Sequence, residues 1–234
     1  MPRIYAHRGA SAELPENTLP AFARATEVGT YGIELDVHLT RDGIPVVIHD
    51  ETVDRTTNGT GAIADFDYAE LTRLDAGDGS AVPTLDQVLD LVGEVLHIDI
   101  EVKAAAAADA VLMATTGRTA NRFAVSSFDH EVLRHLRGKA PGMELWPLTH
   151  GATDDAVAAA VELGSPYLAI DDKFVNHDIV AYLKSRSLGA WVWIVNDLER
   201  AAQLASLGVA GICTDDPAQL VPLEVARPVH LVVP

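Results

Sequence analysis

The sequence is poor in cysteine and in positive charge, and both shortages narrow what the protein can be. Cys213 is the single cysteine among 234 residues, so no disulfide can form within the chain and nothing points to an oxidising compartment. Lys and Arg number 17 against 34 Asp and Glu, which gives a formal net charge of −17. That charge disfavours non-specific binding to nucleic acid or to an anionic membrane surface, although it is compatible with a local basic pocket.

Long apolar runs are also missing from the sequence. The first residues, Met-Pro-Arg-Ile-Tyr-Ala-His-Arg-Gly, contain no apolar segment of signal-peptide length. No later segment has the ~18 uninterrupted apolar residues that a membrane span needs. We therefore expect a cytoplasmic protein without stable membrane association. No G-x-G-x-x-G or Walker-type loop follows a predicted strand, which disfavours nucleotide binding.

Strand and helix patterns alternate along most of the chain. Strands are expected at about 3–7, 32–37, 96–102, 123–126, 143–148, 167–170, 190–195 and 210–213. Helices are expected at about 19–28, 85–92, 106–115, 130–139, 154–163, 176–186, 198–207 and 216–221. Eight such units in a chain near the ~250 residues of a typical (β/α)8 barrel predict that fold, as a single domain over residues 1–234, rather than an open doubly wound sheet. The tail at 222–234 is apolar enough to pack against this domain.

A tight turn sets one hairpin apart from the strand–helix units. Arg41-Asp42-Gly43 joins the strand at 32–37 to a short apolar run at 45–48. Strands joined by so few residues must be antiparallel, because a parallel pair needs a crossover of a dozen residues or more. We therefore expect residues 45–49 outside the barrel sheet, in an insertion at about 38–82 that can form a short helix near 67–74.

The strand at 32–37 carries acidic residues where a buried strand normally carries aliphatic ones. Glu34, Asp36 and His38 share one face, since side chains alternate along a strand. Carboxylates are tolerated in such a place only if they are paired or hold a metal. The acidic residues of this strand therefore predict a functional site. An isolated acidic pair of this kind, however, more often lies on a solvated edge of a sheet.

A second strand adds further carboxylates and a cation. Asp99, Glu101 and Lys103 alternate so that all three point inward. Carboxylates with no cysteine nearby form an oxygen ligand set that suits a hard divalent cation such as Mg²⁺ or Ca²⁺. Asp99 has three candidate roles, as a metal ligand, as a partner of Lys103 behind the ligands, or as a residue of the barrel floor. We favour the partner role.

Histidines and another cation occur where other strands end. His7-Arg8-Gly9 closes the first strand, and His49-Asp50 closes the excursion. Imidazole titrates near neutral pH, so a pair of histidines can act as general acid and base. Arg8 and Lys103 can hold an anionic group, and Arg offers a bidentate fork to phosphate. A metal, two cations and two proton carriers describe phosphoester cleavage better than any other reaction class.

Nine short motifs occur in order along nearly the whole chain: His7-Arg8-Gly9, Pro15-Glu16-Asn17-Thr18, Glu34-x-Asp36, Thr40-x-Asp42-Gly43, His49-Asp50, Arg55-Thr56-Thr57, Pro83-Thr84-Leu85, Glu101-x-Lys103 and Thr214-Asp215-x-Pro217. Together they resemble the signature of the glycerophosphodiester phosphodiesterase family. The resemblance implies a (β/α)8 barrel that hydrolyses small-molecule glycerophosphodiesters to an alcohol and glycerol 3-phosphate, with water as the eventual acceptor.

The resemblance also implies a role for each site residue. Glu34, Asp36 and Glu101 hold one divalent cation, and His7 and His49 are the acid and base. Arg8 and Lys103 lie at the phosphate. Trp193 lines the substrate pocket. Ile194 stands where the family often has Thr, which bears on the pocket and leaves the metal site untouched. Our working assignment makes His49 the base and His7 the acid, but the reverse order stays open. Direct attack by water and attack by a substrate hydroxyl through a cyclic phosphate also stay open.

Two other functions are compatible with the same residues. A phosphodiesterase like phospholipase D or sphingomyelinase would act on lipid head groups and would need an exposed apolar rim at the barrel mouth, which the mostly polar insertion disfavours. A barrel that binds phosphodiesters without turnover is disfavoured by the intact histidines. The head group, the choice between Mg²⁺ and Ca²⁺ and the oligomeric state are not specified by the sequence. His38, His97, Trp146, Trp191 and Cys213 are expected to be structural.

Overall fold

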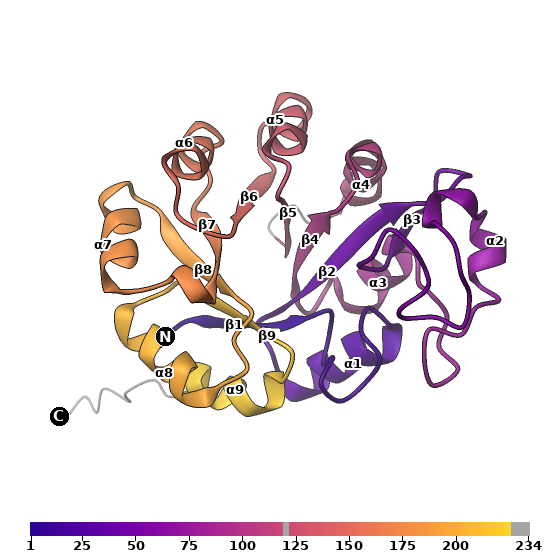
Figure 1. The fold of residues 1–234 in the computed structure, drawn as a ribbon, viewed down its shortest axis with the longest axis horizontal. Coiled ribbons are helices and arrows are strands. Elements are labelled where there is room, and N and C mark those ends of the chain that lie inside the picture. The colour runs from indigo at the N-terminus through magenta and orange to yellow at the C-terminus, as the bar shows by residue number, and fades with distance from the viewer. Residues whose placement is uncertain (119–121, 226–234) are drawn as a thin grey trace.

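A closed barrel of parallel strands, surrounded by helices, forms the centre of the molecule (Figure 1). The computed structural model describes residues 1–118 and 122–225. Within them the barrel strands are β1 (Arg3–His7), β2 (Gly32–Leu39), β4 (His97–Val102), β5 (Phe123–Ser127), β6 (Glu144–Thr149), β7 (Tyr167–Asp171), β8 (Gly189–Trp193) and β9 (Gly211–Thr214). They pair in the order β1-β9-β8-β7-β6-β5-β4-β2, and parallel pairing of β1 with β2 closes the ring. The predicted (β/α)8 fold class is confirmed.

Helices follow the barrel strands and cover the outside of the barrel. They are α1 (Leu19–Val28), α3 (Leu85–Val92), α4 (Ala108–Thr115), α5 (His130–Lys139), α6 (Asp154–Glu162), α7 (His177–Ser185), α8 (Leu198–Leu207) and α9 (Pro217–Val225). The hydroxyl groups of Thr18 and Thr84 accept hydrogen bonds from backbone N–H groups in the first turns of α1 and α3. Gly29 adopts a left-handed conformation, with φ of 84°, and ends α1.

The segment between β2 and β4 leaves the barrel, as the tight turn predicts. β3 (Pro45–Val47) pairs antiparallel with the end of β2, and η1 (Ile63–Asp65) and α2 (Tyr68–Leu71) follow it. The right side of Figure 1 shows β3 and α2 beyond the ring of barrel helices. This segment has a small core of its own, made of Val46, Ile48, Val53, Ile63, Leu71, Ala76 and Val82. α2 is shorter than the helix expected near 67–74.

Large aromatic side chains fill the barrel interior below the site. Tyr5, Trp146 and Trp191 are almost fully buried there, and the rings of Tyr5 and Trp191 lie 4.4 Å apart, edge to face. The rings of Trp146 and Trp191 lie 4.5 Å apart. His97 also belongs to this layer, since its Nδ1 lies 2.7 Å from the Tyr5 hydroxyl. We call this group the aromatic plug. The barrel therefore has a packed floor, and its side chains form a core rather than a pore.

Several element ends differ from those expected. The strand expected at 190–195 ends at Trp193, because residues 194–197 form the loop that precedes α8. The helix expected at 106–115 begins as the short 3-10 turn η2 (Ala105–Ala107) before α4, and another such turn, η4 (Asp172–Phe174), follows β7. The last helix extends to Val225 instead of ending near 221.

Most of the tail predicted to pack, at 226–234, lies outside the described residues. No helix in the described part of the chain is long and apolar enough to cross a bilayer.

Candidate active site

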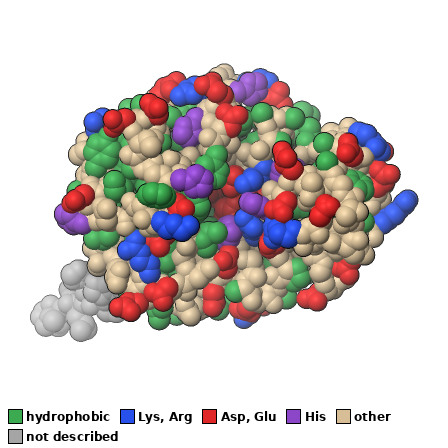
Figure 2. Space-filling model, in the orientation of Figure 1, with side chains coloured by type: hydrophobic (Ala, Val, Ile, Leu, Met, Phe, Trp, Pro, Cys, Tyr) green, Lys and Arg blue, Asp and Glu red, His purple; other side chains and the backbone are tan. Residues whose placement is uncertain are grey.

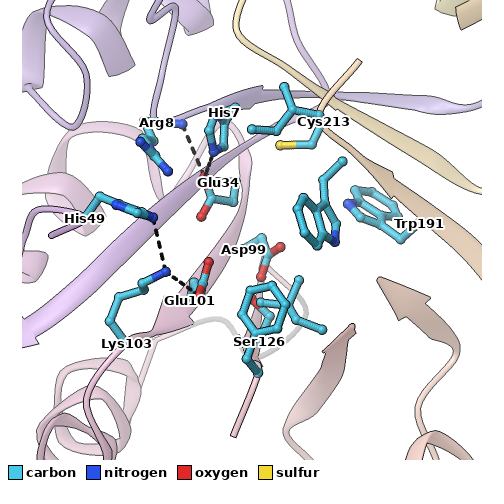
Figure 3. A pocket seen from close by; sticks show the side chains of 14 residues that line it. His7, Arg8, Glu34, His49, Asp99, Glu101, Lys103, Ser126, Trp191 and Cys213 are labelled. Atoms are coloured by element: carbon cyan, nitrogen blue, oxygen red, sulfur yellow. Dashed lines mark hydrogen bonds and ion pairs between the residues drawn. The ribbon is translucent and has the colours of Figure 1, made fainter. Parts of the chain in front are cut away.

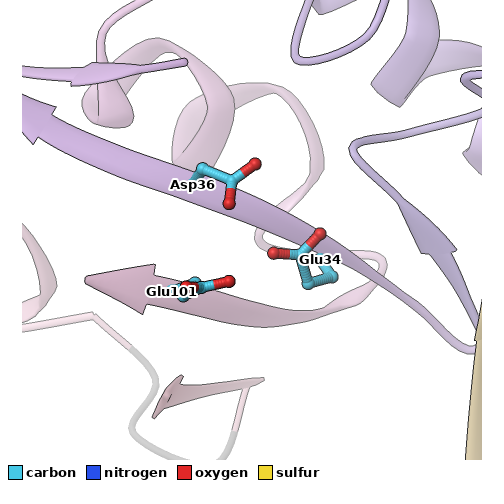
Figure 4. A group of neighbouring side chains, drawn as sticks. All are labelled: Glu34, Asp36 and Glu101. Atoms are coloured by element: carbon cyan, nitrogen blue, oxygen red, sulfur yellow. The ribbon is translucent and has the colours of Figure 1, made fainter. Parts of the chain in front are cut away.

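Three carboxyl groups meet at one side of the barrel mouth. Glu34 and Asp36 lie on β2 and Glu101 on the neighbouring β4, where the register places Asp36 opposite Glu101. One carboxylate oxygen of each residue lies within 4.8 Å of the other two, and Figure 4 shows the three groups close together on the two strands. We call these residues the acidic cluster. Two adjacent strands therefore bring together the three side chains that the sequence analysis named as ligands.

The acidic cluster is short of positive charge. Burial and the neighbouring carboxylates raise the pKa of Glu34 well above its usual value, and they raise the pKa of Glu101 to about 7. Burial also opposes ionisation of Asp36, but Arg8 and other nearby cations hold its pKa below the usual value. Glu34 Oε1 and Asp36 Oδ1 are buried and have no hydrogen-bond partner among the described residues. A divalent cation that prefers oxygen ligands fits this donor set, because it would pair these oxygens and relieve the repulsion.

Arg8 links the acidic cluster to the loop before α1. Its Nε lies 3.1 Å from Asp36 Oδ2, and its Nη1 donates to Glu16 Oε1 at 2.9 Å. Asn17, in the same loop, donates from Nδ2 to Asp36 Oδ2 at 2.9 Å. Arg8 and Asn17 have φ values of 56° and 57°, which are uncommon for residues other than glycine. Both left-handed residues direct a side chain onto the same carboxylate, and local strain of this kind is typical of functional sites.

Lys103 lies on the other side of the acidic cluster. Its Nζ donates to Glu101 Oε1 at 2.8 Å and lies 3.2 Å from His49 Nε2 (Figure 3). Asp36 Oδ1 is 3.8 Å away. No ion pair between Lys103 and Asp99 occurs among the described residues, so the role that we favoured for Asp99 is not the one observed. Asp99 lies one strand repeat deeper than Glu101, and it lines the cavity.

His7 is held from within the barrel. It ends β1, and its Nδ1 lies 2.6 Å from Asp215 Oδ1 in the loop after β9. Its Nε2 lies 3.8 Å from Glu34 Oε2. Burial opposes ionisation of Asp215, but hydrogen bonds from His7, Asn196 and Ser11 lower its pKa to about 2. The His7 ring is thus oriented by a carboxylate at one nitrogen while the other nitrogen faces the acidic cluster.

His49 is held from outside the barrel. It follows β3, and its Nδ1 lies 2.7 Å from the carboxylate of its neighbour Asp50. His38 bonds the backbone carbonyl of His49 through Nε2 at 2.9 Å, so its structural role supports the site directly. Burial lowers the pKa of His49, and the cations Arg8 and Lys103 act in the same direction. With Asp50 accepting from Nδ1 and Lys103 donating to Nε2, the partners indicate the neutral tautomer that carries its proton on Nδ1.

Arg55 joins the His49 region to the loop that holds Arg8. Its Nε and Nη2 donate to Asp50 at 2.8 Å and 2.9 Å. Its Nη1 and Nη2 donate to the two carboxylate oxygens of Glu16, both at 2.8 Å. Glu16 in turn accepts from Arg8. This chain of charged hydrogen bonds connects the insertion to the β1–α1 loop.

A cavity extends from the acidic cluster into the barrel. Figure 2 shows the hollow on this face, with acidic side chains inside it and histidine, Lys and Arg side chains around it. One wall is apolar and consists of Phe128, Leu148, Trp191, Trp193 and Ile194. Trp193, which the resemblance assigns to the substrate pocket, lines this cavity, and so do Trp191 and Cys213, which we expected only as core residues.

Several residues of the site lack a predicted role in the sequence analysis. Asp215, Asp50, Glu16 and Arg55 all belong to the motifs that carry the family resemblance, so the motifs themselves were the available signal. Their partners lie far away in sequence, up to 208 positions in the case of His7 and Asp215. Phe128 follows β5 outside any of the nine motifs, and no sequence signal distinguished it.

Comparisons with known proteins identify relatives of this chain in sequence and in fold. The sequence model of the glycerophosphoryl diester phosphodiesterase family matches residues 7–219. A glycerophosphodiester phosphodiesterase of Caldanaerobacter subterraneus is 36% identical to this chain, over 94% of this chain and 96% of that protein. The solved glycerophosphodiester phosphodiesterase of Thermotoga maritima is 31% identical, with a TM-score of 0.84, and the match covers 95% of this chain and 98% of the other.

A third relative was solved with a reaction product. It is an Oleispira antarctica phosphodiesterase in complex with the product sn-glycerol-3-phosphate, 25% identical, with a TM-score of 0.91 and coverage of 97% of this chain and 98% of the other. These matches confirm the predicted enzyme class, a phosphoric diester hydrolase, and support glycerophosphodiester hydrolysis as the activity. This chain belongs to the glycerophosphoryl diester phosphodiesterase family.

Proposed function

We propose that this chain hydrolyses glycerophosphodiesters to an alcohol and glycerol 3-phosphate, with one divalent cation, Mg²⁺ or Ca²⁺, at the acidic cluster. The observation that carries the proposal is the placement of two histidine–carboxylate pairs beside this cluster, His7 with Asp215 and His49 with Asp50. Each carboxylate fixes Nδ1 of its histidine and leaves Nε2 directed at the site. Such an arrangement provides two oriented proton carriers for the two sides of one phosphodiester bond.

Arg8 and Lys103 are proposed to bind the phosphate. Both cations lie beside the acidic cluster, so an anionic group placed at the cluster lies within their reach. Arg8 can donate two parallel hydrogen bonds to phosphate oxygens, whereas Lys103 provides a compact charge. A divalent cation bound at the cluster would supply further positive charge to offset the charge that develops on the phosphate oxygens.

His49 is proposed as the general base and His7 as the general acid. Because burial lowers the pKa of His49, its ring is neutral at neutral pH and Nε2 can accept a proton from the attacking hydroxyl group or water. His7, unlike His49, also lines a second and more open cavity together with Arg8, Ser11, Asn196 and Asp215. A leaving alcohol in that cavity lies next to His7, which can protonate it from Nε2.

The test is a panel of glycerophosphodiesters assayed for the released alcohol. We expect hydrolysis that is lost with EDTA and restored by adding back Mg²⁺ or Ca²⁺. The ion that restores more activity, Mg²⁺ or Ca²⁺, is then identified as the preferred cation. Activity that survives EDTA would overturn the metal part of the proposal, and an absence of hydrolysis with every diester and ion would overturn the whole of it. A cytoplasmic location and roles in glycerol and lipid metabolism stay predictions from the sequence and the resemblance.

One observation favours a second candidate function, the cleavage of lipid head groups. Phe128, Phe174 and Leu198 are exposed, and they follow β5, β7 and β8, so they lie on the side of the barrel that carries the site. An apolar rim of this kind is what an enzyme acting on a lipid diester would need. Lysophosphatidylcholine belongs in the same panel. Faster turnover of this lipid than of glycerophosphocholine would favour the second candidate.

A further inference from the structure

The second cavity at the site, which we call the outer cavity, holds more negative than positive charge. The carboxylates of Glu16, Asp215 and Asp216 line it. Among the described residues, Arg8 supplies the one guanidinium group of the lining, and Arg8 already pairs with two carboxylates. The excess of carboxylates favours a positively charged group in the outer cavity and disfavours an anionic one.

Two of these carboxylates are already bonded within the protein. Glu16 accepts hydrogen bonds from two arginine side chains, and both of its oxygens take part. Asp215 bonds three neighbouring side chains, including that of His7, and again both oxygens take part. Glu16 and Asp215 therefore hold the site together, and neither has an oxygen without a partner to offer to a ligand.

Asp216 differs from them because its side chain has no cationic partner. Its Oδ1 accepts a hydrogen bond from the backbone N–H of Gln219 at 3.2 Å, in the first turn of α9. Its Oδ2 bonds no residue in 1–118 or 122–225, and its side chain forms no ion pair with any of them. The residue is half-buried, so water screens its charge only in part. Asp216 thus presents an unpaired carboxylate to the outer cavity.

The apolar part of the lining restricts the kind of cation that fits. Ala12 and Ile194 line the outer cavity, and Ile194 also lines the cavity inside the barrel. A primary ammonium group carries three N–H donors that each need an acceptor, but the described carboxylates leave mainly the Asp216 oxygens for them. A quaternary ammonium group has no N–H and surrounds its charge with apolar methyl groups. The outer cavity combines a negative charge with apolar surface, which is the combination that a quaternary ammonium group requires.

We propose that the outer cavity binds the leaving alcohol of the diester, that this alcohol carries a quaternary ammonium group of the choline type, and that Asp216 selects its positive charge. This inference rests on the proposed function and adds the class of head group to it. Asp215, which holds the proposed general acid His7, precedes Asp216 directly. The loop between β9 and α9 thus both orients the proton donor and binds the alcohol that receives the proton.

Two diesters of the same shape and different charge test this proposal. Glycerophosphocholine is compared with its 3,3-dimethylbutyl analogue, in which a carbon atom replaces the ammonium nitrogen. The ammonium group also makes choline the better leaving group, but this chemical difference is the same in every variant of the enzyme. The informative quantity is therefore the ratio of the two kcat/KM values in a variant, compared with the same ratio in the wild type.

Asp216→Asn should lower this ratio by about fivefold, near the upper limit for a partly exposed charge pair. The loss should appear mainly as a higher KM for glycerophosphocholine, because the head-group charge is present in the substrate and in the transition state alike. The asparagine side chain can still accept the hydrogen bond from Gln219, so α9 keeps its cap. Asp216→Lys introduces a like charge and should lower the ratio by more than about tenfold. High salt should bring the wild-type ratio closer to that of Asp216→Asn.

Asp178→Asn is the matched control for the loss of one negative charge. Asp178 lies in the first turn of α7, at the same end of the barrel, and its side chain is 96% exposed outside both cavities. This variant should keep the wild-type ratio. The apolar part of the proposal is tested at Ile194. Ile194→Thr should lower the preference for glycerophosphocholine over glycerophosphoethanolamine by about threefold, whereas Ile194→Leu should retain it.

The possible results separate this inference from the proposed function. A ratio that stays at the wild-type value in both Asp216 variants would overturn the role of Asp216, while hydrolysis of glycerophosphocholine would still support the proposed function. An equal loss in Asp178→Asn would reveal a general effect of chain charge and would also overturn that role. Faster wild-type hydrolysis of the neutral analogue than of glycerophosphocholine would contradict the class of head group. If neither diester is hydrolysed with any divalent cation, the proposed function fails and this inference is overturned with it.

Discussion

The two histidines at the site are supported by different parts of the molecule. His7 ends a barrel strand and pairs with Asp215 from the far end of the chain, and its side chain is 11% exposed. His49 follows a strand outside the barrel and pairs with its own neighbour Asp50, and its side chain is 32% exposed. The barrel register fixes the first pair, whereas the second depends on how the insertion docks. The proposed site is thus assembled from the barrel and from a segment attached beside it.

Different forces hold His7 and His49 in place. We call their surroundings the His7 half and the His49 half of the site. Backbone hydrogen bonds of the β1–β9 and β1–β2 ladders hold the His7 half, whereas the His49 half also depends on the ion pairs of Arg55, whose side chain is 46% exposed. Exposed ion pairs are screened by salt, while backbone ladders are hardly affected. We therefore expect changes in the insertion to act through His49 and to depend on ionic strength.

The largest loss of activity should come from the acidic cluster, which both halves share. Asp36→Asn removes a charge from the cluster and weakens its contact with Arg8, so kcat/KM for glycerophosphocholine should fall on the order of 1000-fold. Calorimetric affinity for Mg²⁺ and Ca²⁺ should fall as well. Asp86→Asn, on the exposed side of α3, is the control and should match the wild type. An Asp36→Asn enzyme with unchanged metal affinity would remove this residue from the ligand set.

The next largest effect separates the two histidines. His7→Ala and His49→Ala should each lower kcat by about 100-fold or more, because each removes one proton carrier. The double variant should lose much less than the product of the two single effects, since both histidines are proposed to serve the cleavage of one bond. Thermal melts verify that the variants are folded. Two single variants that both retain near-wild-type turnover at saturating metal would falsify the acid–base assignment.

Substitution of Arg55 should lower activity less, but it tests most directly whether His49 depends on the insertion. Arg55→Ala removes the fork that holds Asp50 and Glu16, so kcat/KM should fall about tenfold, and Arg55→Lys should recover part of the loss. Arg41→Ala is a matched control, because Arg41 is 52% exposed and pairs with Asp67 on the outer side of the insertion. Assays at low and high salt should show that the wild type loses more activity with salt than the Arg55→Ala enzyme does. Identical behaviour of the two Ala variants would argue that the insertion docks without Arg55.

The smallest effect is a displacement of the pH profile. A general base must be unprotonated, so activity rises as pH increases through its pKa. Burial lowers the pKa of His49 below the ordinary 6.5, so the acidic limb of kcat/KM should lie below pH 6.5. A limb centred above pH 6.5 would assign the base to another group.

The barrel and the acidic cluster were predictable because they depend on local rules. Strand alternation places Glu34 and Asp36 on one face, and the short turn at Gly43 requires the antiparallel excursion that carries His49. The ends of strands meet at one rim of a (β/α)8 barrel, which brings Glu101 to the same place. None of these inferences requires a long-range partner to be known.

The supporting residues were not predictable in the same way. The pairing of His7 with Asp215 depends on barrel closure, and the contacts of Arg55 depend on the path of a loop without periodic pattern. The position of Asp99 was only partly predictable. Strand alternation turns its side chain inward, but it does not determine whether that side chain contacts Lys103 or lines the cavity. The helix expected at 106–115 begins with a 3-10 turn for a similarly local reason, because Ala104 is still extended when Ala105 starts the turn.

The aromatic plug closes the inner end of the cavity, so molecules enter and leave it at the mouth of the barrel. Substrate must enter, and both products must leave, through the one mouth that His7 and His49 border. A product that stays bound at the acidic cluster therefore blocks the path by which the next substrate must enter, because the packed rings of Tyr5, Trp146 and Trp191 close the floor of the described barrel.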